Sequence, residues 1–183
     1  LIAHVGPDQG NALELASGTG QHISVLAQKF PQLTWQPSEV DADRRDSITA
    51  YITEAGLDNV APVATLDATA PGWGAKHGGQ SLIFLSNLLH LISDHEADTL
   101  IREAAQALAP GGVLIIYGPF MRDDELTSEG DIRFHTSLQA QDPDIGYKSD
   151  FDVLDWGVEA GLEVADMIEM PANNLSLVWR RVF

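Results

Sequence analysis

The sequence predicts an α/β fold of three layers, built on a seven-stranded, mostly parallel sheet that ends in an antiparallel hairpin. Apolar segments alternate with helical patterns along the chain, which is typical of βαβ units. No internal repeat, low-complexity tract or flexible linker divides the 183 residues, so one domain spanning residues 1–183 is expected. Only residues 171–174 join the last two apolar segments, too few for a helical crossover, and these segments should therefore pair antiparallel.

The first part of the chain predicts two helices among three strands. Residues 12–16 form an apolar run that leads into small residues, as expected for a first strand. In residues 23–30 apolar side chains recur at positions i, i+3, i+4 and i+7, which predicts one face of a helix. Residues 33–36 predict a short second strand and residues 60–66 a third. Between these strands, residues 48–56 carry a second helical pattern that should end at its glycine.

The middle of the chain predicts two further strands with a helix between them. Residues 81–86 are expected to form the fourth strand. Ser93 and Glu96 have the spacing of a capping box, in which each side chain accepts from the backbone of the other residue, so a helix should begin there. Residues 110–112, Pro-Gly-Gly, should end that helix. Residues 113–117 are continuously apolar, as suits a parallel strand buried on both faces.

The last third of the chain predicts a lid, a helix and the hairpin. Residues 119–149 show no sustained period, and a connection of this length is usually a lid or a binding loop. Asp150 is expected to cap a helix that Gly161 closes. Residues 163–170 and 176–182 predict the two strands of the hairpin.

The composition excludes several classes of partner. The chain has 10 Lys and Arg against 27 Asp and Glu, a net charge of −17. Nucleic-acid binding needs a basic footprint, so no nucleic-acid partner and no anionic membrane surface is expected. No apolar run reaches the roughly 18 residues of a membrane helix. The absence of cysteine suits a reducing cytoplasm. The first residue is Leu1 rather than Met, so the sequence is expected to begin inside a longer protein.

Five small residues, from Ala16 to Gly20, lie between the first strand and the first helix. Such a turn lets a ligand approach the backbone, and the free N–H groups of the helix favour electron-rich groups. A P-loop would need Lys and Ser or Thr after Gly20, and a nucleophile elbow would need glycines on both sides of Ser17. A dinucleotide fingerprint would need glycine at Ile23. The pattern Glu-x-Ala-x-Gly-x-Gly remains, with close packing as the purely structural alternative.

That pattern resembles motif I of class I S-adenosylmethionine-dependent methyltransferases. The resemblance implies a Rossmann-like fold and S-adenosyl-L-methionine as the cofactor. Ala16 stands where the family more often has glycine. The residues that the motif assigns to the cofactor are Glu14, Ala16, Ser17, Gly18, Gly20, Gln21 and His22.

Residues at three further strand ends fit the same family. Glu39 follows the second strand, where a carboxylate can accept both hydroxyls of a ribose, although Asp41 is a rival for that role. Asp67 and Ala68 follow the third strand, where the resemblance implies contact with the adenine. Asn87 follows the fourth strand, where the family places polar residues beside the methionine moiety.

Four motifs give a closer resemblance. The segments ELASGTGQH, WQPSEVD, IIYGPF and MPANNL occur in the order typical of the methyltransferase-like 26 family. Members of that family carry an N-terminal helix with an Arg-Asn pair, which this chain lacks. The expected lid differs as well, because Phe134-His135 replaces the usual Phe-Asp, and Tyr-Lys-Ser-Asp at 147–150 replaces Gly-x-Arg-Asp. The resemblance implies a fold and a cofactor but no methyl acceptor.

Candidate catalytic and substrate residues follow from the same comparison. Methyl transfer from a sulfonium depends mainly on positioning, but an acceptor that carries a proton benefits from a base. His90 is the first candidate base and Tyr117 a second pocket residue, each with core packing as the alternative. Phe120, Asn173 and Asn174 are expected near the substrate, although tight turns alone favour asparagine. The six histidines lack metal-ligand spacing, which predicts no catalytic metal.

These observations predict a methyltransferase that acts on a small-molecule acceptor. The alternative is a non-catalytic module of the same fold that binds the cofactor or another protein. A nicotinamide oxidoreductase is opposed by Ile23, which occupies the position of the third fingerprint glycine. A homodimer is an open alternative for the assembly.

Overall fold

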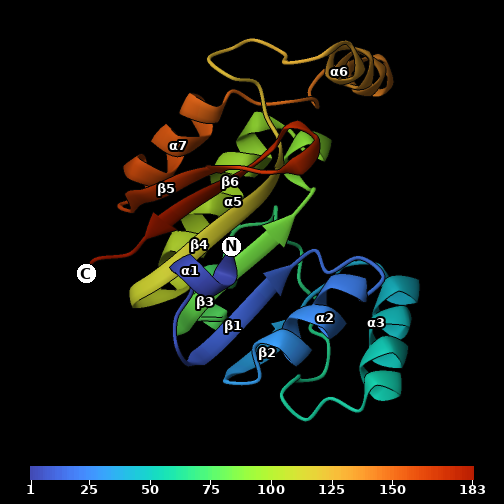
Figure 1. Cartoon of the computed structure of the whole chain (residues 1–183), viewed down its shortest axis with the longest axis vertical. Helices are drawn as coiled ribbons and strands as arrows, with labels where there is room; N and C mark the ends of the chain where they lie inside the picture. Colours follow the sequence, from blue (N-terminus) through green and yellow to red (C-terminus); the bar gives the residue numbers. More distant parts are fainter.

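The computed structural model describes residues 1–183 and contains one six-stranded mixed sheet (Figure 1). The strands follow the order β2-β1-β3-β4-β6-β5. The first four strands are parallel, and β6 runs antiparallel to both β4 and β5. The strands are β1 (Gly10–Leu15), β2 (Leu33–Pro37), β3 (Gln80–Ser86), β4 (Leu108–Pro119), β5 (Glu163–Glu169) and β6 (Asn174–Arg180).

Helices cover both faces of the sheet. No helix is both long and apolar enough to cross a membrane. A short helix precedes β1 and contains no Arg-Asn pair. The helices are α1 (Ile2–Val5), α2 (Gln21–Lys29), α3 (Ala42–Ala55), α4 (Trp73–Lys76), α5 (Asp94–Ala107), α6 (Glu129–Gln141) and α7 (Asp150–Glu159), with 3-10 turns η1 (Leu89–Leu91) and η2 (Pro171–Asn173).

The core consists of two apolar clusters, one on each face of the sheet. Successive side chains of a strand point to opposite faces, so Leu13 and Leu15 of β1 join the larger cluster while Ala12 joins the smaller. The larger cluster includes buried residues of α5 and α7, and the smaller one includes Ile23 of α2 and Ile48 of α3. This arrangement leaves the carboxyl ends of β1, β2 and β3 at one edge of the sheet, between the two sets of helices.

The prediction of a strand at residues 60–66 is wrong, and the sheet therefore has six strands rather than seven. The segment runs beside β2 but makes only two isolated parallel bridges, Trp35 with Val60 and Ser38 with Ala64. Pro62 lies between them and has no N–H to donate to a ladder. The Gln36 side chain instead donates to the Pro62 carbonyl at 2.7 Å.

Helix boundaries follow the predicted caps with two corrections. The helix α5 ends at Ala107, before the predicted stop at residues 110–112, which lie within β4. The Ser93 and Glu96 side chains form both bonds of the capping box of α5. Gly56 ends α3 in the left-handed conformation, with φ at 61°. Asp150 does not cap α7. Ser149 occupies the N-cap position, and the Asp150 carboxylate accepts from the backbone N–H of Asp123 at 3.0 Å.

The 119–149 segment contains a helix that the sequence analysis missed. The thirteen-residue α6 begins at Ser128, which accepts from the Asp131 N–H, and stands apart from the sheet (Figure 1). Leu138 is its one buried residue, which explains why no apolar period is visible. The two ends of the segment meet, because the Met121 N–H donates to the Lys148 carbonyl at 2.9 Å and the Asp150 N–H donates to the Met121 carbonyl at 3.1 Å.

The antiparallel C-terminal hairpin is confirmed. β5 and β6 pair from Glu163 with Arg180 to Glu169 with Leu175. The turn between them is the 3-10 turn η2, in which Ala172 and Asn173 have φ near 60°. β6 inserts between β4 and β5, so β5 forms one edge of the sheet.

Candidate functional site

The loop after β1 is built around two glycines with different roles. Gly20 has φ at 98°, and a Cβ there would lie 2.8 Å from the Ile48 Cα, so glycine allows α3 to pack closely on this turn. Gly18 has φ at 62°, and a Cβ there would meet no atom within 4 Å. Ala16 adopts a positive φ of 49° without being glycine. Gly20 therefore serves packing, whereas Gly18 leaves the backbone open to a ligand.

Two serines join this loop to the loop after β2. The Ser17 N–H donates to the Ser38 carbonyl at 2.8 Å, and the Ser38 N–H donates to the Ser17 Oγ at 3.1 Å. The Ser38 hydroxyl also donates to the carbonyl of Glu14 at 2.7 Å. Ser17 and Ser38 are buried, so these bonds fix the relative position of the two loops.

Glu39 is held by backbone groups of both loops. Its Oε2 accepts from the Gly18 N–H at 3.0 Å, and its Oε1 accepts from the N–H groups of Val40 and Asp41 at 2.9 and 3.3 Å. The guanidinium of Arg44 lies 3.9 Å from the same carboxylate. Asp41, the rival candidate, caps α3 by accepting from the Arg44 N–H. The structure thus buries the Glu39 carboxylate between the two loops, whereas Asp41 caps α3.

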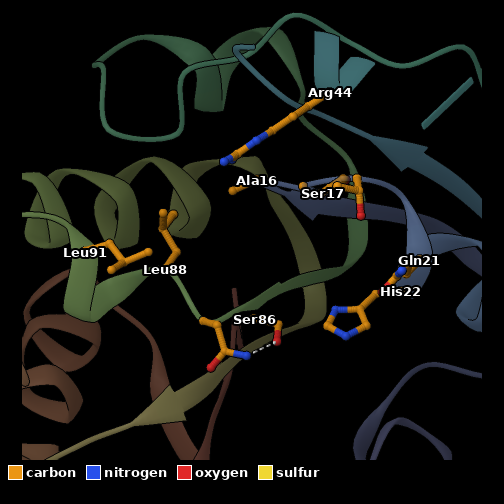
Figure 2. Close-up of a pocket in the computed structure, with 11 residues that line it drawn as sticks. Ala16, Ser17, Gln21, His22, Arg44, Ser86, Leu88 and Leu91 are labelled. Atoms are coloured by element: carbon orange, nitrogen blue, oxygen red, sulfur yellow. Dashed lines mark hydrogen bonds between the residues drawn. The ribbon is translucent and has the colours of Figure 1, made fainter. Parts of the chain in front are cut away.

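The first cavity lies at the start of α2 and has a volume of about 250 Å³. It contains six of the residues predicted for the cofactor: Ala16, Ser17, Gly18, Gln21, His22 and Asn87. Figure 2 shows Arg44 reaching from α3 to the edge of this cavity near Ala16, and the His22 ring turned toward Ser86. The start of a helix here supplies N–H groups without intrahelical partners.

A second cavity of about 220 Å³ continues the first along the strand ends. The two share Ala16, Arg44 and Leu88. The second cavity brings together three further predicted contacts, Glu39, Asp67 and Ala68. The Asp67 Oδ1 accepts from the N–H and the hydroxyl of Thr69, at 2.9 and 2.7 Å.

A third cavity of about 350 Å³ opens on the other side of the first. It shares His22, Ser86 and Asn87 with the first cavity and is also lined by Val25, Leu26, Phe84 and Tyr117. Asn87 adopts a positive φ of 57°, a conformation that asparagine tolerates. Its N–H donates to the Tyr117 carbonyl at 2.9 Å.

Two predicted cofactor residues, Glu14 and Gly20, line none of these three cavities. Glu14 is 2% exposed, and its Oε2 has no hydrogen-bond partner. Burial raises the pKa of Glu14 to about 7, while a hydrogen bond with Ser17 acts in the opposite direction. Glu14 is therefore a buried acid beneath the turn that keeps its proton to a higher pH than an exposed glutamate does.

The structure places His90 in an aromatic cluster, away from the three cavities. Its ring contacts Phe134 and Tyr147 edge to face, with centroids 5.5 and 6.1 Å apart. Burial, and secondarily the charge of Lys148, lower the pKa of His90 to about 4. Its Nδ1 is buried without a partner. This environment favours the packing role for His90.

The three residues predicted near the substrate also lie outside the cavities. Phe120 is buried in the larger core cluster. Asn173 donates to the Asp131 carboxylate of α6 at 3.3 Å, and Asn174 donates to the Pro171 carbonyl at 3.1 Å. The two asparagines therefore hold the hairpin turn, and Asn173 also joins it to α6.

Sequence reasoning missed two cationic residues. Arg44 lines both cofactor-side cavities, and its place in the first turn of α3, three residues after the cap Asp41, was the available signal. Lys148 is 5% exposed and donates to the carbonyls of Leu89 and Ile92 at 2.6 and 2.7 Å. Burial lowers the pKa of Lys148, and the charge of Asp94 opposes this. No group of three or more His, Asp or Glu side chains is arranged to hold a metal ion.

Several known proteins with similar sequence or structure are methyltransferases. The chain is 29% identical over 128 residues to trans-aconitate 2-methyltransferase of Variovorax paradoxus. The alignment covers 68% of this chain and 44% of that protein. An O-methyltransferase family protein from Burkholderia thailandensis superposes with a TM-score of 0.82 at 22% identity, over 94% of this chain and 51% of that one. Human N-acetylserotonin methyltransferase, solved with S-adenosylmethionine, superposes with a TM-score of 0.75 at 11% identity. The superposition covers 94% of this chain and 48% of that one.

These likenesses establish the α/β fold seen in methyltransferase structures. The chain spans about half the length of the relatives it matches. A family match covers nearly all of the chain, residues 1–181. The chain thus belongs to the family described as "Protein of unknown function (DUF938)".

Proposed function

We propose that the protein is an S-adenosylmethionine-dependent methyltransferase that acts on a small-molecule acceptor. The observation that carries the proposal is the continuous path formed by the first two cavities across the carboxyl ends of the strands. Ligands of open α/β sheets bind at this edge. Residues that the sequence pattern assigned to one cofactor line that path from both ends.

The second cavity fits the nucleoside part of the cofactor. Each carboxylate oxygen can accept more than one hydrogen bond, so Glu39 retains acceptor capacity for the two ribose hydroxyls while backbone N–H groups hold it. Asp67 uses Oδ1 within its own turn, which leaves Oδ2 to accept from the adenine amino group. In this arrangement Glu39 would bind the ribose and Asp67 the adenine, which gives a role to both acids that line the second cavity.

The first cavity fits the amino-acid part of the cofactor. Gly18 offers open space at the backbone, and the start of α2 attracts a carboxylate through its free N–H groups and dipole. When bound, the cofactor supplies an electrophilic methyl group. The residues of the chain orient it and keep water from one side.

The proposed acceptor is a small molecule because of charge and cavity size. A chain with net charge −17 repels nucleic acid. The third cavity, about 350 Å³, has the size of a small-ligand site. Named relatives of this chain are methyltransferases, which supports the reaction class. The resemblance to the methyltransferase-like 26 proteins stays a prediction.

One observation favours the alternative, a non-catalytic module of the same fold. Ala16 holds a positive φ of 49° and lies where the first two cavities join. Its methyl group therefore narrows the path at the point that the cofactor would cross. A module that binds another protein would tolerate this constriction, because no cofactor would have to cross it.

Calorimetric titration tests the proposal directly. Separate titrations use S-adenosylmethionine, S-adenosylhomocysteine and NAD. We expect micromolar binding of the first two and none of NAD. A protein that binds both sulfur compounds but methylates nothing in an acceptor screen would support the non-catalytic alternative. If neither sulfur compound binds, the result would contradict both the enzyme and a module that binds the cofactor, and would leave only a module that binds another protein.

A further inference from the structure

We propose that His22 accepts the proton of the methyl acceptor, and that the acceptor is an uncharged molecule with a flat apolar body and a hydroxyl at one end, bound in the third cavity. This inference rests on the proposed function and names the substrate class and the base of that site. It assigns His22 a role beyond the cofactor contact expected from the sequence.

His22 lies where the two relevant cavities meet. It lines both the first cavity, which fits the amino-acid part of the cofactor, and the third cavity. Ser86 and Asn87 at the end of β3 line both as well, and Figure 2 shows the His22 ring turned toward Ser86. A group transferred from one cavity to the other passes between these side chains. The imidazole is therefore beside the transfer point, unlike that of His90.

The distribution of polarity in the third cavity indicates the acceptor class. His22, Ser86 and Asn87 lie at the junction with the first cavity, whereas Val25, Leu26 and Phe84 give an apolar wall and Tyr117 completes the lining. No Lys, Arg, Asp or Glu lines it. An anionic acceptor would lose hydration there without gaining a cation, which is unfavourable. An apolar ring against the wall with its hydroxyl at His22 matches both features.

The trans-aconitate named for the Variovorax relative carries three carboxylates at neutral pH, and the third cavity offers no counter-charge for them. The relative and this chain are therefore expected to differ in acceptor. This contrast separates the proposal from one inherited through sequence similarity.

The proposed step balances in atoms and charge. The acceptor oxygen forms a bond to the methyl carbon while the bond from that carbon to sulfur breaks, and the electron pair of that bond stays on sulfur as a neutral thioether. The hydroxyl proton moves to a nitrogen of His22. The His22 side chain is exposed to solvent, so the proton can leave to water afterwards. Imidazole is suited to this exchange near neutral pH.

The first experiment follows the His22 imidazole by NMR while 2-naphthol is added, without cofactor. The signal is assigned by its loss in His22→Gln. We expect 2-naphthol to shift this signal and trans-aconitate to leave it in place. Val25→Asp, at a side chain 48% exposed, should abolish the shift while S-adenosylmethionine binding stays unchanged.

Three results of this experiment would overturn the acceptor site. They are no shift with 2-naphthol, an equal shift with trans-aconitate, and a shift that survives Val25→Asp.

The second experiment measures methyl transfer to a panel of phenols. We expect His22→Gln to lower kcat roughly 100-fold when S-adenosylmethionine is saturating, so that any change in cofactor affinity does not contribute. His95→Gln, an exposed histidine outside the three cavities, should behave as the wild type. A kcat of His22→Gln equal to that of the wild type would overturn the proposal that His22 is the base. A wild-type protein that binds S-adenosylmethionine but methylates no phenol would overturn the acceptor class, whereas one that does not bind it contradicts the proposed function itself.

Discussion

The Glu39 carboxylate accepts a hydrogen bond from the Gly18 N–H at 3.0 Å, which joins the loop after β2 to the loop after β1. Its other oxygen accepts from the N–H groups of Val40 and Asp41. Only 3% of Glu39 is exposed. The acid is therefore fixed in place before a ligand arrives, and little conformational entropy remains to be lost on binding.

Replacing this acid should weaken cofactor binding. We expect Glu39→Ala to raise the dissociation constant of S-adenosylmethionine by about 10-fold or more, because a hydrogen bond to a charged group contributes roughly 1.5–3 kcal/mol. Calorimetry measures the change. Glu54→Ala removes an exposed acid of α3, the helix that follows Glu39, and should bind as the wild type does. Unchanged affinity in Glu39→Ala would contradict the nucleoside site.

Glycine at position 16 should relieve a strained backbone. Ala16 has φ at 49°, where an L-residue other than glycine is disfavoured by roughly 1–2 kcal/mol. Part of the gain is lost because glycine is more flexible when unfolded. We expect Ala16→Gly to raise the free energy of unfolding by up to about 1 kcal/mol in denaturant titrations. Ala50→Gly, in the middle of α3, should instead lower it by about 1 kcal/mol. A loss of stability in Ala16→Gly would show that the strain is absent.

Stability should fall with rising pH because of Glu14. Its pKa is raised by burial from 4.5 to about 7, so the folded state binds the proton more tightly than the unfolded state. The contribution is fully present below about pH 4.5 and is lost as the pH rises through 7. Between pH 5.5 and 8 we expect the Tm of the wild type to fall more than that of Glu14→Gln, by on the order of 5 °C. Parallel Tm curves for the two proteins would contradict this prediction.

Asp131 should hold α6 against the hairpin. Its carboxylate accepts from the Tyr147 hydroxyl at 2.8 Å and from Asn173 at 3.3 Å. Burial raises its pKa, but hydrogen bonds from Ser128 and then Tyr147 outweigh this and lower it. We expect Asp131→Ala to speed tryptic cleavage at Arg133 by about 10-fold with little change in Tm, because α6 buries little. Asp144→Ala, an exposed acid beyond α6, serves as the control. Equal cleavage rates would mean that α6 is held by other contacts.

His90 should matter for stability rather than for binding. It is 6% exposed and packs against Phe134 and Tyr147. Deleting this ring should cost about 2 kcal/mol in the free energy of unfolding, with the affinity for S-adenosylmethionine unchanged. Exposed His95→Ala is the matched control. Activity lost in His90→Ala with stability and binding intact would restore His90 as the base.

Local signals made much of the fold predictable. The capping box at Ser93 and Glu96 and the glycine stop at Gly56 depend on a few neighbouring residues, and both caps form as expected. The prediction of a strand at 60–66 failed because an apolar pattern does not show that Pro62 lacks the N–H needed for a ladder. The helix α6 was not predicted because a helix held mainly by polar contacts at Asp131 has no apolar period.

The candidate site was predictable where residues follow a strand directly. Ala16, Glu39, Asp67 and Asn87 all lie at the carboxyl ends of successive strand-like segments and line connected cavities. His90 lies only three residues beyond Asn87, but the turn η1 directs it toward α6 instead. Sequence spacing cannot give that direction, since it depends on how Phe134 and Tyr147 pack.

The backbone hydrogen bonds that join Met121 to Lys148 and Asp150 have a consequence for how this family can change. Because Met121 follows β4 directly and Asp150 begins α7, residues 122–147 leave and rejoin the body of the protein at one point and form an appendage whose length is not tied to the register of β4. Natural variation can exchange this appendage as a unit while the loops that hold Glu39 remain intact. Relatives that share the loops after β1 and β2 are therefore free to differ in the segment that corresponds to residues 122–147.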